Sequence, residues 1–518
     1  MLTQGLLRAA QTRPRGLSTR FEDRTRTWPQ TVDRVARLAA ALQRMGIRPG
    51  DRVAILALNS DRYLEHFYAV AWAGAVAVPI NTRLAVPEIA YILGDSGAAV
   101  LLVDDAFVPI LDPLGDALSS MRGVIHLGSA APAAGLACYE AMIAAESAAE
   151  LVARDGDDLA GIFYTGGTTG KPKGVMLSHA NLVINAMNAA PSIGLEPAPV
   201  FLHAAPMFHL GDGAWTFAVT MLGGSHCFIP KFDALDCLRA IAEQGVTDTM
   251  LVPTMIAMML NLPDVKHYDT SRLRQIVFGA APMPEATLHR ALDLWPGTRF
   301  MTGWGMTELS PIGTVLPARY TAPEHIASGR YRSCGQAALS AAVRIVDEND
   351  REVPRGTVGE LVVRSPTVMQ GYWNNPEATA ETLRGGWLHS GDAAWMDDEG
   401  FVFIVDRLKD MIITGGENVY PAETESAIST LAGVAECVVI GIPDDRWGEA
   451  VHAIVVPRPG HGVAPDQVID HCRQRLARYK CPRSVEIRLE PLPLTGAGKI
   501  QKAQLRAPYW AGRGKGVN

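Results

Sequence analysis

The most informative segment of this 518-residue chain is Tyr164-Thr-Gly-Gly-Thr-Thr-Gly-Lys-Pro-Lys-Gly-Val175. It follows an apolar run typical of a buried strand, Leu159 to Phe163, and precedes a helical pattern that begins near His179. Glycines allow backbone N–H groups to turn toward a bound anion, while threonine hydroxyls and lysines add neutral and charged donors. The segment therefore predicts a loop that binds a polyphosphate.

Two other interpretations of this loop are disfavoured. A flexible linker rarely carries two lysines and a threonine pair at the exit of a buried strand. A Walker A loop needs a glycine separated by four residues from Gly-Lys-[Ser/Thr], but Thr165 occupies that position, and Pro172 follows Lys171. A P-loop hydrolase is therefore excluded, and ATP, if used, must be bound by another architecture.

Strands and helices alternate on both sides of the loop. Apolar residues at helical spacing predict a helix from Trp28 to Met45, which Gly46 ends. Further helices are expected at Asp61 to Ala73 and at Pro87 to Leu93. The expected strands are Arg52 to Leu58, Ala75 to Ile80, Ala98 to Val103, Phe201 to Pro206, Ser225 to Ile229, Thr249 to Val252 and Gln275 to Phe278. This alternation predicts mostly parallel sheets covered on both faces.

The pattern changes near residue 335. Short strands joined by turns are expected at Ala342 to Val346, Gly359 to Val363 and Gly400 to Val405, which predicts a small β-rich subdomain. The last 110 residues or so mix strands (Glu436 to Gly441, Ala450 to Pro457) with helices (Ala422 to Thr430, Ala464 to Arg478). We therefore expect an α/β protein with a large N-terminal domain, residues 1–406, and a small mobile α+β C-terminal domain, residues 407–518.

Composition narrows the class and the partners. The 47 Lys and Arg against 54 Asp and Glu give a net charge of -7, and 48% of the residues are hydrophobic. Such a chain can fill real cores, which excludes a disordered protein. Because it lacks a strong positive field, a nucleic acid or an anionic membrane surface is not an expected partner.

Cysteines and apolar runs indicate the compartment. The seven cysteines form no Cys-x-x-Cys pair, so we expect reduced, mostly buried thiols in a cytoplasmic protein. The first 26 residues contain six arginines and no apolar stretch of signal-peptide length. The longest apolar run, Tyr68 to Ile80, falls short of the ~20 residues that cross a bilayer. It predicts a buried helix followed by a buried strand, and no membrane span.

Five further motifs accompany the loop. They are Pro206-Met-Phe-His-Leu-Gly-Asp212, Met301-Thr-Gly-Trp-Gly-Met-Thr-Glu-Leu-Ser-Pro311, Trp387-Leu-His-Ser-Gly-Asp392, Asp406-Arg-Leu-Lys-Asp-Met-Ile-Ile-Thr-Gly-Gly-Glu-Asn-Val-Tyr-Pro421 and Pro493-Leu-Thr-Gly-Ala-Gly-Lys-Ile500. In this order, the six segments resemble the adenylate-forming (ANL) superfamily of acyl-CoA synthetases, luciferases and peptide-synthetase adenylation domains. The resemblance extends from about residue 20 to 505.

The resemblance implies a two-step ligase reaction. A carboxylate attacks the α-phosphorus of MgATP to give acyl-AMP and pyrophosphate, and a thiol, coenzyme A, then displaces AMP. The first step brings two anions together, so charge neutralisation and positioning matter more than proton transfer. The cofactors expected by resemblance are ATP, Mg²⁺ and coenzyme A. A homodimer is compatible with these features.

The resemblance also assigns residues to the nucleotide. Glu308 is the expected Mg²⁺ ligand, with Thr307 beside the phosphate. Asp392 is the expected acceptor for the ribose hydroxyls, Arg407 the contact to ribose or phosphate, and Trp304 the ring beside adenine. The triphosphate side is expected to comprise Thr165, Gly166, Gly167, Thr168, Thr169, Gly170 and Lys173. Gly166 stands where many relatives have Ser, and Lys502 where Arg is common.

Different residues of the C-terminal part are expected to serve the two steps of the reaction in turn. Lys499 resembles the lysine that enters the site only for adenylation, and Lys409 matches the boundary residue about which the C-terminal domain rotates. Gly415, Gly416 and Glu417 are then expected to line a tunnel for the thiol. Glycines at these positions would let a pantetheine arm pass close to the backbone.

The resemblance places the acyl pocket after the Phe-His motif and near residues 279 and 303. Small residues at 279–281 would leave room for a chain or a flat ring. His209 either gates the carboxylate or is a satisfied interior histidine. Asp212 is unusual in an apolar pocket, because an unpaired buried carboxylate is costly, so it either faces solvent or pairs with a polar substrate. The expected pocket residues are His209, Asp212, Trp215, Gly279, Ala280, Ala281 and Gly303.

The acid is expected to be fatty, medium-chain or aryl, and the favoured acceptor is free coenzyme A. An acyl-AMP former that loads a carrier protein, or one that feeds an oxygenase, is the alternative. A catalytically silent nucleotide- or acyl-binding protein is disfavoured because Glu308, Asp392 and Lys499 are all present.

Overall fold

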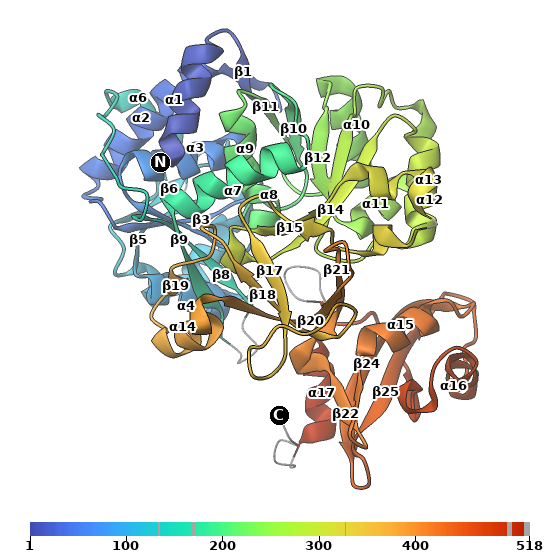
Figure 1. Ribbon diagram of the computed structural model, residues 1–518. Helices are drawn as coiled ribbons and strands as arrows, with labels where there is room; N and C mark the ends of the chain where they lie inside the picture. Colours follow the sequence, from blue (N-terminus) through green and yellow to red (C-terminus); the bar gives the residue numbers. More distant parts are fainter. Residues whose placement is uncertain (133–134, 167–170, 327, 495–499, 512–518) are drawn as a thin grey trace. The chain divides into compact units, whose positions relative to one another are not determined.

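The computed structural model describes residues 1–132, 135–166, 171–326, 328–494 and 500–511 (Figure 1). The chain forms two compact units. The larger unit consists of Met1–Val343 and Val363–Leu388, and the smaller unit of Arg344–Val362 and His389–Asn518. The boundary expected at 406/407, and the mobility of the part that follows it, remain predictions.

Two sheets form the framework of the larger unit. In the first, six neighbouring strands from β14 to β1 run parallel, and antiparallel strands close both edges. Its order is β16 (Gln336–Ala337), β15 (Ile312–Leu316), β14 (Arg299–Gly305), β13 (Gln275–Phe278), β12 (Asp248–Leu251), β10 (Val200–His203), β11 (Ser225–Phe228), β1 (Leu17–Phe21) and β2 (Arg24–Thr27).

The second sheet has a parallel part from β8 to β7, and β9 and β19 add antiparallel strands at one edge. Its order is β19 (Gly371–Tyr372), β9 (Lys173–Ser178), β8 (Leu159–Thr165), β4 (Val76–Pro79), β3 (Arg52–Leu56), β5 (Ala98–Val103), β6 (Gly123–His126) and β7 (Ala137–Cys138). The mostly parallel, covered architecture expected from the sequence is confirmed.

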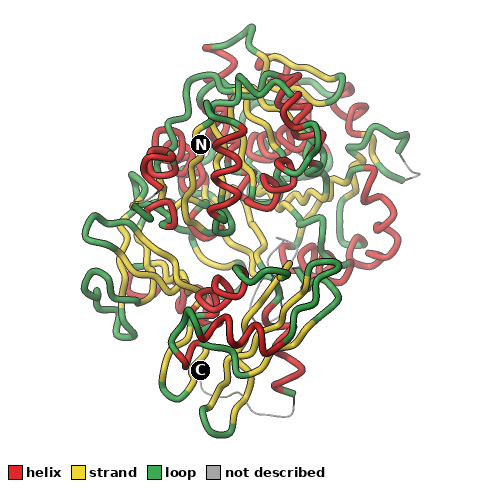
Figure 2. Tube along the Cα trace, turned by 90° about the vertical axis from the view of Figure 1, so that its right-hand side faces the viewer, coloured by secondary structure: helices red, strands yellow, loops and turns green. Residues whose placement is uncertain are grey.

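Helices cover these sheets, as the red and yellow tubes of the larger unit show (Figure 2). They are α1 (Leu2–Thr12), α2 (Trp28–Arg44), α3 (Asp61–Trp72), α4 (Val86–Ser96), α5 (Leu111–Leu114), α6 (Tyr139–Ala145), α7 (His179–Ser192), α8 (Leu210–Gly213), α9 (Trp215–Met221), α10 (Ala234–Gln244), α11 (Pro253–Leu260), α12 (Glu285–Leu294), α13 (Pro323–Ile326) and α14 (Pro376–Thr382).

Helix α3 occupies the centre of the larger unit. It contacts strands of both sheets, and all of its residues are buried. Ser60 caps its first turn by accepting a hydrogen bond from the Tyr63 backbone N–H. A helix that is buried on every side needs partners for its charges, and Asp61 pairs with Arg24 at 3.0 Å. The buried helix and strand expected for residues 68–80 are confirmed as α3 and β4.

The smaller unit has two sheets. A four-stranded sheet contains β17 (Ala342–Val346), β18 (Gly359–Arg364), β20 (Leu388–Met396) and β21 (Val402–Arg407), which confirms the expected β-rich subdomain. A five-stranded sheet contains β22 (Ile412–Thr414), β23 (Glu417–Val419), β24 (Val434–Asp444), β25 (Gly448–Pro457) and β26 (Ser484–Ile487). Its helices are α15 (Pro421–Ser429), α16 (Pro465–Arg473) and α17 (Lys502–Trp510).

The expected helix over Ala464 to Arg478 was too long. Helix α16 ends at Arg473, and a short 3₁₀ turn over Arg478–Lys480 follows. Thr430 and His471 form a hydrogen bond of 2.8 Å that ties the end of this helix to the end of α15.

Candidate active site

The predicted phosphate loop connects the two strands of a β-hairpin. Strands β8 and β9 run antiparallel, and Thr165 pairs with Lys173 at the hairpin's end. The expected passage from strand through loop to helix was therefore incomplete, because β9 separates the loop from α7. Ser178 caps α7 by accepting a hydrogen bond from Asn181 N–H, so this helix begins beyond the hairpin. Thr165, Gly166 and Lys173 are described; Gly167, Thr168, Thr169 and Gly170 lie outside the described residues.

Helix α4 anchors the base of the hairpin. The Tyr164 hydroxyl donates a hydrogen bond of 2.6 Å to Asp95 Oδ2. Burial and the Asp95 carboxylate raise the pKa of Tyr164, so the phenol keeps its proton and remains a donor. On the other side of the loop, Lys171 Nζ lies 5.4 Å from the centroid of the Tyr91 ring, also on α4.

Glu308 lies in a short 3₁₀ turn, η4 (Thr307–Leu309), directly after β14. Its side chain is buried, and Oε1 accepts a hydrogen bond of 2.8 Å from the Tyr372 hydroxyl. The Glu308 carbonyl accepts a second bond, from Met369 N–H at 2.8 Å. Burial and the Glu308 carboxylate raise the pKa of Tyr372, which therefore stays protonated.

Tyr372 also contacts the phosphate hairpin. Its ring centroid lies 4.9 Å from Lys173 Nζ, and its backbone pairs with Val175 of β9. One tyrosine thus connects the predicted phosphate lysine with the predicted metal carboxylate. Sequence reasoning missed Tyr372, because nothing in the local pattern around Gly371-Tyr372 marks it as a partner of residues far away along the chain.

The residues near Glu308 fit Mg²⁺ bound together with phosphates. One carboxylate with a neighbouring hydroxyl, that of Thr307, is a normal protein contribution when phosphates supply further oxygens. Within the part of the chain that the structure describes, no group of three or more His, Cys, Asp or Glu side chains could hold a metal ion. The described residues therefore offer no site at which protein side chains alone would hold a metal ion.

Asp392 and Arg407 face each other in the smaller unit. They are paired across β20 and β21, and Arg407 Nε lies 2.8 Å from Asp392 Oδ1. Asp392 is buried, whereas Arg407 is partly exposed and also donates to the Ser390 carbonyl at 3.2 Å. The expected ribose acceptor and the expected ribose or phosphate contact are thus direct neighbours.

The expected thiol-channel residues lie in the hairpin of β22 and β23. Gly415 and Gly416 have φ values of 63° and 83°, a region that other residues adopt only with strain. Gly415 N–H donates to the Trp447 carbonyl at 2.8 Å, and a β-carbon at Gly415 would come within 2.6 Å of the Trp447 ring. The exposed residue Glu417 begins β23.

Two arginines flank the Trp447 ring. The Cζ atoms of Arg446 and Arg483 lie 4.7 and 4.8 Å from its centroid. Sequence reasoning did not identify this group, because Arg483 is far from Trp447 along the chain. Of the other residues expected in this part, Lys409 is exposed in the turn Leu408–Asp410, and Lys499 lies outside the described residues.

Asp212 does not face solvent. It is buried on α8, and its Oδ2 lies 2.6 Å from His203 Nδ1. His203 Nε2 lies 3.0 Å from His226 Nδ1, and His226 Nε2 lies 3.0 Å from the Thr220 hydroxyl. Burial raises the pKa of Asp212 and lowers that of His203 to about 3, which favours the neutral form of each group. The solvent-facing alternative is wrong, because Asp212 has an internal polar partner.

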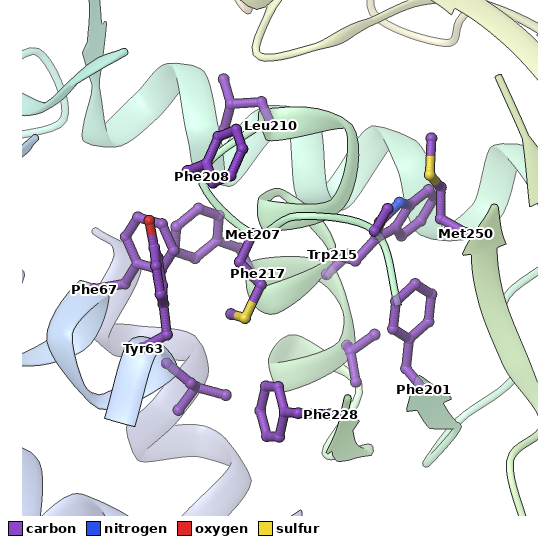
Figure 3. Packing of buried hydrophobic residues seen from close by; sticks show 14 of the residues in the cluster. Tyr63, Phe67, Phe201, Met207, Phe208, Leu210, Trp215, Phe217, Phe228 and Met250 are labelled. Carbon is purple, nitrogen blue, oxygen red and sulfur yellow. The ribbon is translucent and has the colours of Figure 1, made fainter. Parts of the chain in front are cut away.

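The remaining residues expected in the acyl pocket differ in exposure. Trp215 is buried and stacks on Phe201, with ring centroids 5.6 Å apart (Figure 3). His209 is half-buried beside Phe208, with 4.5 Å between ring centroids. Gly279 and Gly303 are half-buried, whereas Ala280 and Ala281 are exposed.

Met250 was missed by the sequence analysis. A β-carbon built on Gly211 would lie 3.6 Å from Met250 Cε, and one built on Gly279 would lie 4.0 Å from it. Met250 therefore lies between the turn that begins α8 and the end of β13, in the same buried cluster as Trp215 (Figure 3). Trp304, the residue expected beside adenine, is half-buried and its ring packs on Gly313, where a β-carbon would come within 2.7 Å of the ring.

Comparison with known proteins identifies the chain. Residues 6–373 match the AMP-binding enzyme family, and residues 423–499 match the AMP-binding enzyme C-terminal domain. The chain belongs to the AMP-binding enzyme family. This AMP-binding enzyme is an acid–thiol ligase of the adenylate-forming superfamily, as the resemblance in the sequence indicated.

Its relatives differ in substrate. The AMP-binding enzyme is 40% identical to a feruloyl-CoA synthase from Amycolatopsis sp over 98% of this chain and 100% of the relative. It is 35% identical to the fatty acid–[acyl-carrier-protein] ligase ScoC from Streptomyces coeruleorubidus over 98% and 96%. The structure of the anthranilate CoA ligase AuaEII with anthranoyl-AMP is similar, with a TM-score of 0.88, 28% identity, and coverage of 98% and 97%. Among the described residues, no helix is long and apolar enough to span a membrane.

Proposed function

We propose that this enzyme activates an aryl or fatty carboxylic acid with MgATP, giving acyl-AMP and pyrophosphate, and transfers the acyl group to coenzyme A. The observation that carries the proposal is the grouping of Lys173, Tyr372 and Glu308 beside the hairpin that bears the threonine- and glycine-rich turn. An ammonium group and a buried carboxylate at one place suit a polyphosphate with its metal ion.

The first step joins two anions. A carboxylate oxygen of the acid attacks the α-phosphorus, and the bond from this phosphorus to the bridging oxygen of pyrophosphate breaks. Lys173 and Thr165 would hold the departing phosphates, and Glu308 with Thr307 would hold Mg²⁺, which when bound neutralises phosphate charge. Each charge-assisted hydrogen bond of this kind contributes about 1.5 to 3 kcal/mol.

The smaller unit would supply the remaining nucleotide contacts. Asp392 can accept both ribose hydroxyls, because an ionised carboxylate has several acceptor sites. Arg407 already contacts this carboxylate and would also reach toward the ribose or the phosphate. Lys499 would add a cation for adenylation alone, consistent with its place in a glycine-rich segment.

In the second step, the coenzyme A thiol attacks the acyl carbon and AMP leaves. We assign Lys409 as the hinge and the Gly415–Gly416 turn as the wall of the pantetheine channel. Arg446 and Arg483 beside Trp447 support an anionic thiol substrate at this turn, because guanidinium groups bind phosphates well.

An aryl acid is the first substrate class to test. The feruloyl-CoA synthase is the more similar of the two relatives compared above, and its name specifies an aromatic acid. Within this chain, the glycines at 211 and 279 face the Met250 side chain, and Trp215 offers a broad aromatic surface nearby. An acid bound beside the Met250 side chain would have little room in width, which favours a flat ring over a bulky branched acid.

The second candidate acceptor is a carrier protein, because ScoC is a fatty acid–[acyl-carrier-protein] ligase. The test measures pyrophosphate release with acids from C2 to C18, benzoates and cinnamates. It then compares thioester formation with free coenzyme A and with a phosphopantetheinyl carrier. Acid-dependent pyrophosphate release and consumption of free coenzyme A are expected. Release without any use of coenzyme A would favour the carrier, and no release with any acid would contradict the proposed function.

A further inference from the structure

A short segment of the larger unit, residues 366–373, joins the two halves of the polyphosphate end; we call it the clasp. On one side it binds the Glu308 turn, because Met369 N–H donates to the Glu308 carbonyl and Ser310 Oγ donates to the Thr367 carbonyl at 2.9 Å. On the other side it binds β9, because Gln370 N–H donates to the Met176 carbonyl at 3.0 Å.

Tyr372 is the clasp residue whose side chain reaches both charged groups. Its hydroxyl donates to Glu308 Oε1 at 2.8 Å, and its ring faces Lys173 Nζ at 4.9 Å from the centroid. Only 7% of Tyr372 is exposed, so the surrounding residues hold the ring in place. A hydrogen bond from a fixed donor limits the rotation of a carboxylate, and the π-face of a ring attracts an ammonium group.

We propose that Tyr372 is a positioning residue for the metal–polyphosphate end of the site: its hydroxyl orients the Glu308 carboxylate and its ring seats the Lys173 ammonium. The inference rests on the proposed function, since it takes ATP with a divalent cation as the ligand. It goes further because it assigns one residue, Tyr372, to position both the carboxylate that would bind the cation and the lysine that would bind the phosphates.

The two contacts can be separated by substitution. Tyr372→Phe removes the hydroxyl and keeps the ring, whereas Tyr372→Leu removes both. Tyr139→Phe is the matched control, because the Tyr139 hydroxyl also donates to a buried carboxylate, Glu65 Oε2, at 2.6 Å. Tyr139→Phe loses the same kind of hydrogen bond outside the proposed site. Any loss of stability caused by removing a buried tyrosine hydroxyl should therefore occur in both variants.

Binding is measured by calorimetry on the full chain, with ATP in the presence of EDTA and with ATP plus Mn²⁺ as the probe cation. We expect Tyr372→Phe to weaken binding of the Mn²⁺–ATP complex about tenfold, which is the scale of one hydrogen bond to a charged group. The affinity of this variant for metal-free ATP should stay within twofold of the wild-type affinity. Tyr372→Leu should also weaken metal-free ATP, by about threefold, through the lost contact to Lys173. Tyr139→Phe should change neither.

A double-mutant cycle keeps the inference testable if Tyr372→Leu fails to fold. In the Glu308→Gln background, Tyr372→Phe should cause no further loss of Mn²⁺-dependent binding, because the group it orients has lost its charge. Equal weakening of metal-free and Mn²⁺-bound ATP by Tyr372→Phe would assign the hydroxyl a structural role and overturn this inference alone. A wild-type chain that binds no nucleotide would refute the proposed function as well.

Discussion

The Arg407 guanidinium holds the Asp392 carboxylate across neighbouring strands, with Nε and Oδ1 2.8 Å apart. Asp392 is 4% exposed, and the guanidinium supplies a cation beside the buried carboxylate. Both residues were assigned to the nucleotide from two separate sequence motifs, and the strand register brings them side by side. A ribose that binds Asp392 would therefore meet a carboxylate that is already oriented.

Asp392→Asn should abolish the preference for the ribose hydroxyls. We expect the wild type to bind ATP at least tenfold more tightly than 2′,3′-dideoxy-ATP, and the variant to bind both about equally, because a neutral amide accepts fewer hydrogen bonds. Calorimetry with the two nucleotides measures this ratio. Asp398→Asn, an exposed residue in the same hairpin, is the control. Retained discrimination in Asp392→Asn would exclude the ribose role.

Lys499→Ala should separate the two half-reactions. Acyl-AMP formation is expected to fall by about 10² to 10³ or more, the scale for removing one donor from a transition state, while thioester formation from supplied acyl-AMP is much less affected. Pyrophosphate release and coenzyme A consumption measure the two steps. Lys266→Ala, an exposed lysine elsewhere, is the control. Equal loss of both steps would contradict a role in adenylation alone.

Lys409→Pro should have the opposite effect. Proline fixes φ and removes the backbone donor, so a hinge at this position would be locked while the adenylation arrangement stays available. Adenylation is expected to remain near wild type and thioester formation to fall sharply. Lys409→Ala keeps the backbone freedom and should retain more of the second step. If the proline variant loses adenylation to the same extent, the hinge assignment fails.

Met250→Ala should shift acid selectivity toward larger substrates. Removing the end of this side chain opens space between Gly211 and Gly279, and a methylene in an apolar pocket changes discrimination by about tenfold or more. The ratio of kcat/KM for a long or substituted acid to that for a short acid measures the shift. Met258→Ala, at a methionine that is 54% exposed, is the control. An unchanged ratio would place the acyl group elsewhere.

The protein should lose stability in mild acid, partly through His66. Burial lowers the pKa of His66 to about 3, and neither ring nitrogen has a hydrogen-bond partner within the described residues. Above the unfolded pKa of about 6.5 both states bind no proton, so this site adds no pH dependence there. As the pH falls toward 3, the unfolded chain binds a proton that the folded chain refuses, and the folded state loses stability.

His66→Leu should therefore reduce the acid sensitivity. By pH 5 the contribution of one such histidine reaches up to about 2 kcal/mol, so the fall in thermal midpoint between pH 8 and pH 5 should be smaller in the variant. Differential scanning fluorimetry at both pH values measures this. His267→Leu, whose side chain is 80% exposed in the wild type, should behave like the wild type. An equal fall in His66→Leu would mean that other groups dominate.

The sequence was a good guide where short-range patterns decide the structure. Strands such as Ala98–Val103 and Gln275–Phe278 were predicted with the observed bounds, because a buried parallel strand is a compact apolar run between turn residues. Strand β9 was missed, since Pro172 and Gly174 at its beginning are typical of a loop, and its pairing with β8 creates the strand.

Long-range partners could not be predicted. Tyr372 meets Glu308 and Lys173 through the order of strands in a sheet, which no local pattern encodes. The same holds for Asp212, whose unusual position in an apolar segment was noticed but whose internal partner, His203, comes from a neighbouring strand. Residue types suggested where chemistry occurs, whereas tertiary packing determines which side chains carry it.

The clasp also limits how the enzyme can be redesigned. Its backbone is hydrogen-bonded to the turn that carries Glu308 and to strand β9 of the hairpin that carries Lys173. If the threonine- and glycine-rich hairpin were moved into another scaffold without residues 366–373, Lys173 and Glu308 would lose the Tyr372 side chain that contacts both of them. A module for exchange between such ligases would therefore comprise three separate pieces of chain, transferred together.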